Sequence, residues 1–320
     1  DLDSTVTQGS FDDPGISDDL EFVSPSHLLR PQRRFGRDSP PIPTFTPSST
    51  GDCKMLRVGA VSYLNTKPLI HGLQERLGDR GELRLALPSV LADDLAAGRL
   101  DVALIPSVEF FRGQDYRIVS DAAIACRGPV WSVRLLSRVP VPQIRRLALD
   151  EGSRTSAAMV RILLREMHDL TPETVPLPMD ASPETIDADA VLMIGDRAMH
   201  PASGVYREIW DLGDRWCRWT ELPFVFAMWV VRRGADVENH HSFTELADIL
   251  QESRDEGLSN LESIAVRESG AHGLTKEDLH RYFAENLYFR LGPGERLGLE
   301  AFRTKAVAQG LIPECAPTVA

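Results

Sequence analysis

Polar side chains follow the end of a predicted strand near residue 61, where a binding cleft would need them. The four side chains are Ser62, Tyr63, Asn65 and Thr66. They come directly after an apolar run at 57–61 and before a predicted helix that begins near Pro68. In open α/β sheets ligands bind outside the carboxyl ends of the strands, where a following helix offers free backbone N–H groups. These side chains are therefore predicted to contact a ligand; an ordinary turn, with Asn65 capping the helix, is the alternative.

A second hydroxyl-rich segment, at 152–156, is predicted to bind an anion. Its polar side chains are Ser153, Arg154, Thr155 and Ser156. A predicted strand ends at Asp150, glycine turns the chain, and an amphipathic helix follows. A carboxylate there would meet helix N–H groups, hydroxyls and a guanidinium, a local field able to outweigh an acidic surface. Simple helix capping is the alternative, and the spacing of a nucleotide-binding loop, G-x-x-x-x-G-K-[ST], is absent.

Two further strand ends carry candidate ligand contacts. Ser107 follows a predicted strand at 101–105, so it falls at the same sheet edge as Asn65, with a role as helix N-cap as the alternative. Asp196 follows a predicted strand at 189–194, and we expect it to cap the next helix or to orient side chains in the cleft, capping being favoured.

Gly128 and Ser132 precede an extended run at 133–137. Glycine lets the backbone approach a ligand closely, and Ser132 would then donate a hydrogen bond at the floor of the cleft. The alternative is an ordinary alternating strand on which Ser132 faces solvent.

Strands and helices alternate from residue 56 onward, which predicts an α/β fold with parallel sheets. The predicted strands are 57–61, 83–87, 101–105, 133–137, 146–150, 174–177, 189–194, 206–211 and 224–231. The predicted helices are 68–77, 89–97, 154–167, 196–200, 242–256, 259–268, 275–289 and 294–309, with candidate caps at Ser242 and Thr275. The extended runs at 133–137 and 224–231 flank a complete α/β block, so they predict two lobes joined by a hinge of two crossings.

The expected boundaries follow from this order of elements. They are a disordered tail at 1–54, lobe one at 55–137 and 222–313 with the C-terminal helices packed on it, lobe two at 138–221, and a C-terminal tail at 314–320. The first segment is rich in Pro, Ser and Asp and shows no periodicity. Met55 as the true start of translation and a genuine solvated extension both fit this composition.

Composition excludes several classes of partner. The 320 residues carry a formal charge of −12, which argues against nucleic acid or an anionic membrane as the main partner. No run reaches the ~18 apolar residues of a membrane span, and the first thirty residues show no secretory signal. The four cysteines lie far apart, so we expect reduced thiols and neither a zinc site nor a redox motif.

Five segments in order resemble the chorismate dehydratase family of the futalosine route to menaquinone. They are Arg57–Leu69, Leu104–Glu109, Gly128–Val133, Asp150–Ser156 and Leu222–Ala227. Together they span roughly Met55 to Pro313. The resemblance implies a bilobal fold like that of type II periplasmic binding proteins, and a cytoplasmic lyase that dehydrates chorismate to 3-[(1-carboxyvinyl)oxy]benzoate without a cofactor or a metal.

The same resemblance implies roles for individual residues. Asn65 would be catalytic, its amide polarising either the developing carbanion or the departing hydroxyl. The side chains that would hold carboxylates are Ser107, Ser132, Ser153, Thr155 and Ser156. The family is thought to use the enolpyruvyl carboxylate of the substrate as the base, and this accounts for the lack of an obvious base in the sequence.

Two other functions remain open at this point. One is a non-catalytic solute-binding protein for a small organic acid, which would normally carry an export signal. The other is the sister enzyme 1,4-dihydroxy-6-naphthoate synthase, which would need a histidine in the cleft; His200 is the nearest candidate. The only partner expected is the small-molecule substrate, and both a monomer and a homodimer are compatible with the sequence.

Overall fold

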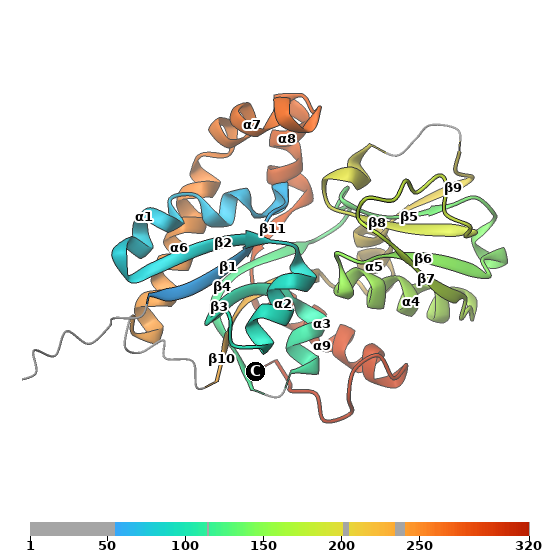
Figure 1. Cartoon of the computed structure of the whole chain (residues 1–320). Coiled ribbons are helices and arrows are strands. Elements are labelled where there is room, and N and C mark those ends of the chain that lie inside the picture. The colour runs from blue at the N-terminus through green and yellow to red at the C-terminus, as the bar shows by residue number, and fades with distance from the viewer. Residues whose placement is uncertain (1–54, 114, 201–204, 234–240, 320) are drawn as a thin grey trace, which may run out of the picture. The chain divides into compact units, whose positions relative to one another are not determined.

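Two mixed β-sheets organise the fold (Figure 1). The computed structural model describes residues 55–113, 115–200, 205–233 and 241–319, which all belong to one unit that runs from Thr50 to Ala320. The predicted disordered tail at 1–54 lies outside the described residues.

The first sheet has the strand order β11-β4-β10-β3-β1-β2. Its strands are β1 (Leu56–Val61), β2 (Gly81–Ala86), β3 (Val102–Pro106), β4 (Tyr116–Cys126), β10 (Phe224–Arg232) and β11 (Tyr288–Arg290). Strand β1 pairs in parallel with β2 and β3, whereas β10 runs antiparallel to β3 and β4. Residues of β1, β3 and β10 are buried along almost their whole length, as expected for central strands covered on both faces.

The second sheet has the order β7-β6-β8-β5-β9. Its strands are β5 (Val133–Ser137), β6 (Arg146–Asp150), β7 (Glu173–Leu177), β8 (Ala190–Ile194) and β9 (Glu208–Asp211). Strand β6 is parallel to β7 and β8, and β5 is antiparallel to β8 and β9.

Helices cover both sheets. The α-helices are α1 (Leu73–Leu77), α2 (Pro88–Ala96), α3 (Ser107–Arg112), α4 (Arg154–His168), α5 (Leu212–Thr220), α6 (Phe243–Ser259), α7 (Leu261–Ser269), α8 (Lys276–Arg281) and α9 (Pro293–Ala308). The 3₁₀ segments are η1 (Leu64–Ile70), η2 (Gly78–Arg80), η3 (Val141–Gln143), η4 (Asp196–Met199) and η5 (Gly270–His272), and η6 (Tyr282–Asn286) is a π-helix. Helix α2 packs on β1 and β3, α6 on β4, α9 on β10, and α4 on β8. The side chains of Ser242 and Thr275 cap α6 and α8, as predicted.

The structure differs from the expected fold in several elements. Both sheets are mixed, because β10 and β5 run against their neighbours. Strand β5 was expected to be the last strand of lobe one before the chain enters lobe two. It belongs to the second sheet, so the first crossing between the sheets falls at 127–132. The long strand β4 and the short strand β11 were not predicted, and the helix expected at 275–289 ends in the π-helix η6 before β11. The expected C-terminal tail is partly packed, with Ala316 buried and Val319 against the core.

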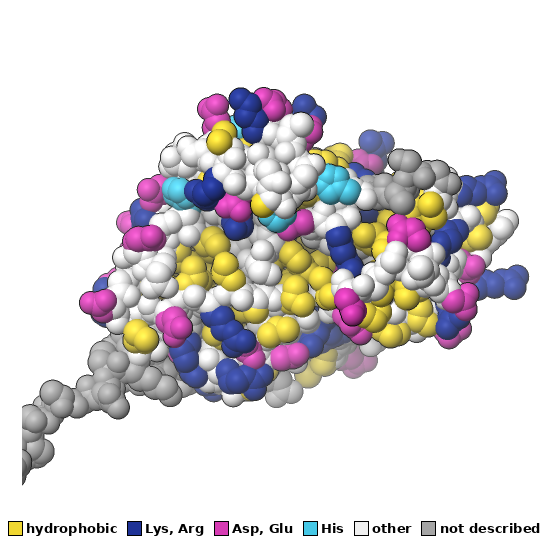
Figure 2. Space-filling view, turned by 45° about the horizontal axis from the view of Figure 1, so that its top comes forward, with side chains coloured by type: hydrophobic (Ala, Val, Ile, Leu, Met, Phe, Trp, Pro, Cys, Tyr) yellow, Lys and Arg dark blue, Asp and Glu magenta, His cyan; other side chains and the backbone are white. Residues whose placement is uncertain are grey.

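No helix in the described ranges is long and apolar enough to cross a membrane. Figure 2 shows acidic and basic side chains interspersed over the face it draws, without a continuous basic patch there.

Candidate functional site

A pocket lies where the two sheets face one another. It is lined by Val61, Tyr63, Asn65, Pro88, Pro106, Ile124, Val130, Ser132, Val133, Ser153, Ser156, Ile194, Gly195, Phe226 and Ala227. Val61, Pro106 and Ile194 are the last residues of β1, β3 and β8. Ala227 joins them because antiparallel pairing sets it opposite Pro106. The pocket therefore occupies the carboxyl ends of the parallel strands, where α/β folds bind ligands.

The structure brings five of the predicted site residues together in this lining: Tyr63, Asn65, Ser132, Ser153 and Ser156. The other predicted residues lie outside the lining: Ser62, Thr66, Ser107, Gly128, Arg154, Thr155 and Asp196. Ser62 is exposed and Thr66 is fully buried. An added Cβ at Gly128 would meet open space, so no close approach of backbone to a neighbour explains that glycine.

Asn65 lines the pocket. The hydroxyl of Thr66 donates to Asn65 Oδ1 over 3.2 Å, and no described residue accepts a hydrogen bond from the amide nitrogen. The alternative role as a helix cap is wrong, because Tyr63 is the N-cap residue of η1 and no side chain caps it. The Asn65 NH₂ group is therefore a donor that this loop can offer to a ligand.

Tyr63 reaches from the first sheet to two glycines of the second. A Cβ at Gly195 would lie 3.1 Å from the Tyr63 ring, and one at Gly152 would lie 2.8 Å from its hydroxyl oxygen. Gly195 also has φ of +66°, which favours glycine by itself. The Tyr63 hydroxyl is buried without a hydrogen-bond partner among the described residues. Burial raises the pKa of the Tyr63 phenol, with the carboxylate of Asp150 as the next cause.

The turn before α4 carries two more hydroxyl side chains that line the pocket. Ser153 Oγ accepts a hydrogen bond from the Ser156 backbone N–H over 3.2 Å, and the Ser153 hydroxyl donates to Ser156 Oγ over 2.8 Å. Ser153 is thus the N-cap of α4 and a lining residue at once. The predicted roles of cap and ligand contact do not exclude each other, because an anion at a helix N-terminus uses the same groups.

A buried ion pair between Asp150 and Arg197 stabilises the turn before α4. The Asp150 side chain is fully buried and accepts hydrogen bonds from the backbone N–H groups of Gly152 (2.9 Å) and Ile194 (3.3 Å) and from Arg197 Nη2 (2.7 Å). Arg197 Nη1 also donates to the carbonyl of Met179 over 2.8 Å. Asp150 therefore ties the turn that follows β6 to the end of β8, where Ile194 lines the pocket. The sequence analysis treated Asp150 only as a strand end.

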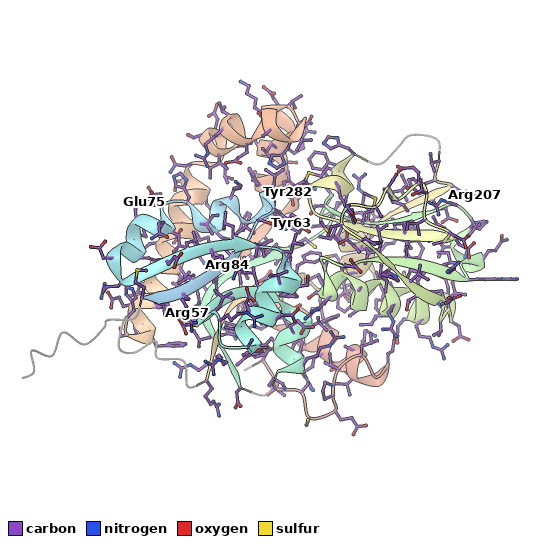
Figure 3. The ribbon with its side chains drawn as sticks, in the orientation of Figure 1. Arg57, Tyr63, Glu75, Arg84, Arg207 and Tyr282 are labelled. Carbon is purple, nitrogen blue, oxygen red and sulfur yellow. The ribbon has the colours of Figure 1, made fainter. Side chains whose placement is uncertain are left out.

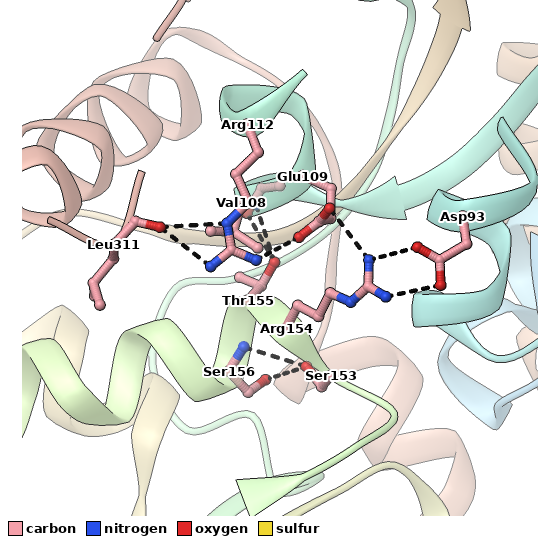
Figure 4. Close-up of polar contacts among 10 residues, drawn as sticks. Asp93, Val108, Glu109, Arg112, Ser153, Arg154, Thr155, Ser156 and Leu311 are labelled. Carbon is pink, nitrogen blue, oxygen red and sulfur yellow. Dashed lines mark hydrogen bonds and ion pairs between the residues drawn. The ribbon is translucent and has the colours of Figure 1, made fainter. Parts of the chain in front are cut away.

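Thr155 and Ser107 join the two sheets instead of facing the pocket. The backbone N–H of Val108 donates to Thr155 Oγ1 over 3.2 Å, and the two hydroxyl oxygens lie 3.4 Å apart (Figure 4). Ser107 also donates to the carbonyl of Val225 over 2.8 Å. Both side chains are fully engaged by protein groups, which is a different use from the carboxylate contacts expected for them.

Arg154 makes a second link of the same kind. Its guanidinium contacts both carboxylate oxygens of Asp93, at 2.9 and 2.8 Å, and Glu109 at 3.3 Å (Figure 4). Asp93 and Glu109 lie on α2 and α3, so the contact crosses from the second sheet to helices of the first. We conclude that Arg154 stabilises the approach of the two sheets rather than lining the pocket.

Asp196 makes a third link. The favoured role as a helix cap is wrong, because the N-cap residue of η4 is Gly195 and no side chain caps it. Asp196 Oδ1 instead accepts from the backbone N–H of Leu64 over 3.2 Å, and Oδ2 lies 3.3 Å from Nδ1 of His272. Burial is the main cause that raises the pKa of the Asp196 carboxyl, whereas the Leu64 N–H opposes it. This link fixes the loop that carries Asn65.

The pocket has a second, apolar wall that the sequence analysis missed. Phe226 is buried to 9% exposure and also lines the pocket. The apolar lining residues at the ends of β1, β3 and β8 could have been predicted from the sequence, because ligands in α/β folds bind at the carboxyl ends of strands. Among the described lining residues none carries a charge, so hydroxyls, an amide and a phenol are the only polar side chains that face a ligand.

The two mixed sheets with a pocket between them form a fold like that of periplasmic binding proteins. Solved structures with similar folds include a protein of Archaeoglobus fulgidus (TM-score 0.66, 20% identity, covering 81% of this chain and 98% of that chain) and the periplasmic aliphatic sulphonate binding protein SsuA from Escherichia coli (TM-score 0.54, 13% identity, 82% and 94%). Within this type, the chain belongs to the menaquinone biosynthesis family, whose model matches residues 56–308. The chain is also similar to the chorismate dehydratase of Thermus thermophilus, with 32% identity over 266 residues that cover 77% of this chain and 93% of that protein.

Proposed function

We propose that this protein is a chorismate dehydratase, a lyase of menaquinone biosynthesis that converts chorismate to 3-[(1-carboxyvinyl)oxy]benzoate. The observation that carries the proposal is the combination of family membership with a pocket in which the polar side chains of the described lining residues are all neutral hydrogen-bond donors and acceptors. The cytoplasmic location expected for such an enzyme rests on the same membership.

The neutral lining supports a substrate-assisted elimination. Chorismate carries two carboxylates and a ring that becomes aromatic when water leaves, so the enzyme must orient the substrate, exclude solvent and stabilise developing charge. No described lining residue is an acid or a histidine that could remove the ring proton. In line with the family resemblance, the proposal assigns that step to the enolpyruvyl carboxylate of the substrate itself, which takes the ring proton while the bond between the ring and its hydroxyl oxygen breaks. The departing hydroxide then takes up this proton to form water, which regenerates the carboxylate.

Each polar lining residue has a role in this proposal. The Asn65 NH₂ would donate to the charge that develops during elimination, because no described residue accepts a hydrogen bond from it. Ser132, Ser153 and Ser156 would hold carboxylates, the last two at the N-terminus of α4. Tyr63 would donate to a substrate oxygen through its unpartnered hydroxyl.

The links across the pocket suggest how the site excludes water. We propose that the two sheets form two lobes, with crossings at 127–132 and 221–223, and that the contacts of Thr155, Arg154 and Asp196 stabilise their closed arrangement. Closure of this kind commits the substrate and strengthens hydrogen bonds within the site.

The two alternative functions are a solute-binding protein and the sister enzyme 1,4-dihydroxy-6-naphthoate synthase. A solute-binding protein is suggested by the fold of SsuA, but that likeness shows the fold alone. The sister enzyme would need a histidine in the cleft; among described residues none lines the pocket, and His200 is exposed and contacts the carbonyl of His272.

Turnover of chorismate tests the proposal directly. We expect purified protein to convert chorismate to a meta-substituted benzoate, followed by ultraviolet absorbance and by proton NMR of the aromatic ring. Heat-denatured protein is the control for spontaneous breakdown. Saturable binding of chorismate without any new aromatic product would show a solute-binding protein and contradict the proposal.

Replacing Tyr63 with phenylalanine is expected to weaken substrate binding without harming the fold. Loss of a hydrogen bond to a charged oxygen is worth about 1.5–3 kcal/mol, so kcat/KM should fall roughly 10- to 100-fold. The melting temperature of the free protein should stay the same or rise, because the deleted hydroxyl has no partner in the folded state.

Tyr206→Phe is the matched control. Its hydroxyl is likewise buried without a partner among described residues, but it lies outside the pocket. Steady-state kinetics and thermal melts of both variants should therefore separate a ligand contact from a general effect of losing a phenol. Unchanged kcat/KM in Tyr63→Phe would remove Tyr63 from the site.

A further inference from the structure

The turn that presents Ser132 to the pocket has an unusual backbone. Trp131, directly before it, has φ of +64°, a left-handed conformation that a residue with a side chain adopts only when its surroundings impose it. The carboxylate of Asp211 accepts the backbone N–H groups of Val130 (2.9 Å) and Trp131 (2.6 Å). The Ser132 carbonyl accepts the N–H of Gly195 over 2.9 Å. The backbone of this turn is therefore held from the second sheet.

Tyr282, which lies 150 residues after Ser132 in the chain, contacts the same turn. The hydroxyl of Tyr282 donates to Ser132 Oγ over 2.8 Å, and both side chains are 1% exposed. The Tyr282 ring packs edge-on against Trp131, with ring centroids 5.7 Å apart. Asn286, at the end of the same π-helix η6, donates to the carbonyl of Pro129 over 3.0 Å. Figure 3 shows Tyr282 and the pocket residue Tyr63 together at the junction of the two sheets.

The direction of the Tyr282–Ser132 hydrogen bond decides what Ser132 can offer a ligand. A serine hydroxyl has one hydrogen to donate and two lone pairs to accept with. A phenol is the stronger acid of the two hydroxyls, and no other described group accepts from Tyr282, so its buried O–H is satisfied only by donating to Ser132. The Ser132 hydrogen is then left for the pocket, where a carboxylate can accept it.

We propose that Tyr282 is a positioning residue that fixes Ser132 as a hydrogen-bond donor to a carboxylate of the substrate. This inference rests on the proposed function and extends it to a residue that touches Ser132 but does not line the pocket. The reverse hydrogen bond would turn the lone pairs of Ser132 toward the ligand and repel an anion. The π-helix has a part in this arrangement, because it carries both Tyr282 and Asn286 to the turn; such segments are common at functional sites.

The test is a double-mutant cycle of Tyr282→Phe and Ser132→Ala. Tyr282→Phe keeps the ring against Trp131 and removes only the hydroxyl. We expect KM for chorismate to rise roughly 3- to 10-fold with a smaller change in kcat, because a carboxylate contact exists before and during the reaction. Ser132→Ala should raise KM at least as much. The double variant should be no worse than Ser132→Ala, because without Ser132 the phenol has nothing to position.

Binding of the reaction product by calorimetry gives a second readout that does not depend on turnover, and the same pattern is expected in Kd. Thermal melts check that each variant is folded, and Tyr206→Phe again serves as the phenol control. Multiplicative losses in the double variant, or an unchanged KM and Kd in Tyr282→Phe, would overturn the positioning role while wild-type turnover stood. Wild-type protein that neither converts chorismate nor binds the product would instead refute the proposed function and, with it, this inference.

Discussion

Replacing Asn65 with alanine is expected to lower kcat by about a hundredfold or more, by analogy with the loss of one oxyanion-hole donor. Asn65 lines the pocket and no described residue accepts from its NH₂, so this hydrogen-bonding capacity is available to the reacting substrate. If it acts on charge that appears only during elimination, KM should change much less than kcat. Steady-state kinetics with chorismate, together with a thermal melt, measure both effects.

Asn65→Asp separates catalysis from a structural role. Thr66 could still donate to an aspartate oxygen, so the loop should keep its conformation. The new carboxylate would lie beside a substrate that already carries two, and repulsion should weaken binding as well as turnover. Asn260→Asp makes the same chemical change at a position outside the pocket, where the amide only donates to the Glu256 carbonyl. Near-normal turnover in a well-folded Asn65→Asp protein would remove Asn65 from the mechanism.

Strand ends were the most predictable part of the site. Hydrophobicity and the turn residues that follow predict strands that end near 61, 105, 150 and 194. In the structure, the last residues of three of these strands, β1, β3 and β8, line the pocket. Strand β6 ends at Asp150, which lies beneath the pocket instead. The rule that ligands bind at carboxyl ends needs only the direction of each strand, which the alternation of strands and helices provides.

The direction of each side chain was harder to predict. Ser153 and Ser156 line the pocket together because the N-cap side chain contacts the residue three positions later, whereas Thr155 points to α3. That distinction follows from the geometry of the N-cap and could have been drawn from the sequence. The partners of Arg154 could not have been predicted from the sequence. Asp93 and Glu109 lie 61 and 45 residues away and contact Arg154 only when the two sheets approach each other.

The elements that were missed have weak local signals. Strand β4, with the sequence YRIVSDAAIAC, mixes an aspartate with three alanines and lacks clean alternation, and it is a strand because β10 pairs along it. Strand β11 has three residues and continues a helical pattern, so only its pairing with β4 distinguishes it. Tyr282 escaped notice for the same reason: its role depends on a contact across 150 residues.

Replacing Asp150 with alanine is expected to destabilise the protein by about 3–5 kcal/mol, the usual effect of breaking a buried ion pair from one side. The substitution leaves the N–H groups of Gly152 and Ile194 without their acceptor, and it leaves Arg197 without its buried partner. At roughly 2–4 °C per kcal/mol for a chain of this size class, the melting temperature should fall on the order of 10 °C. Thermal melts and urea unfolding measure the change.

The same carboxylate connects stability to the site. Asp150 holds the turn from which Ser153 and Ser156 reach the pocket, so the folded fraction of Asp150→Ala should also bind chorismate more weakly, with KM raised. Asp150→Asn combined with Arg197→Gln removes both charges and keeps hydrogen-bonding groups in place. This pair should recover a large part of the stability lost in Asp150→Ala, because no uncompensated charge is then buried. Arg165→Gln removes an arginine whose contacts with Asp169 and Thr171 are exposed, and should shift the melting temperature by little. A double variant no more stable than Asp150→Ala would show that the pair is not coupled, and that the turn is held by its own hydrogen bonds.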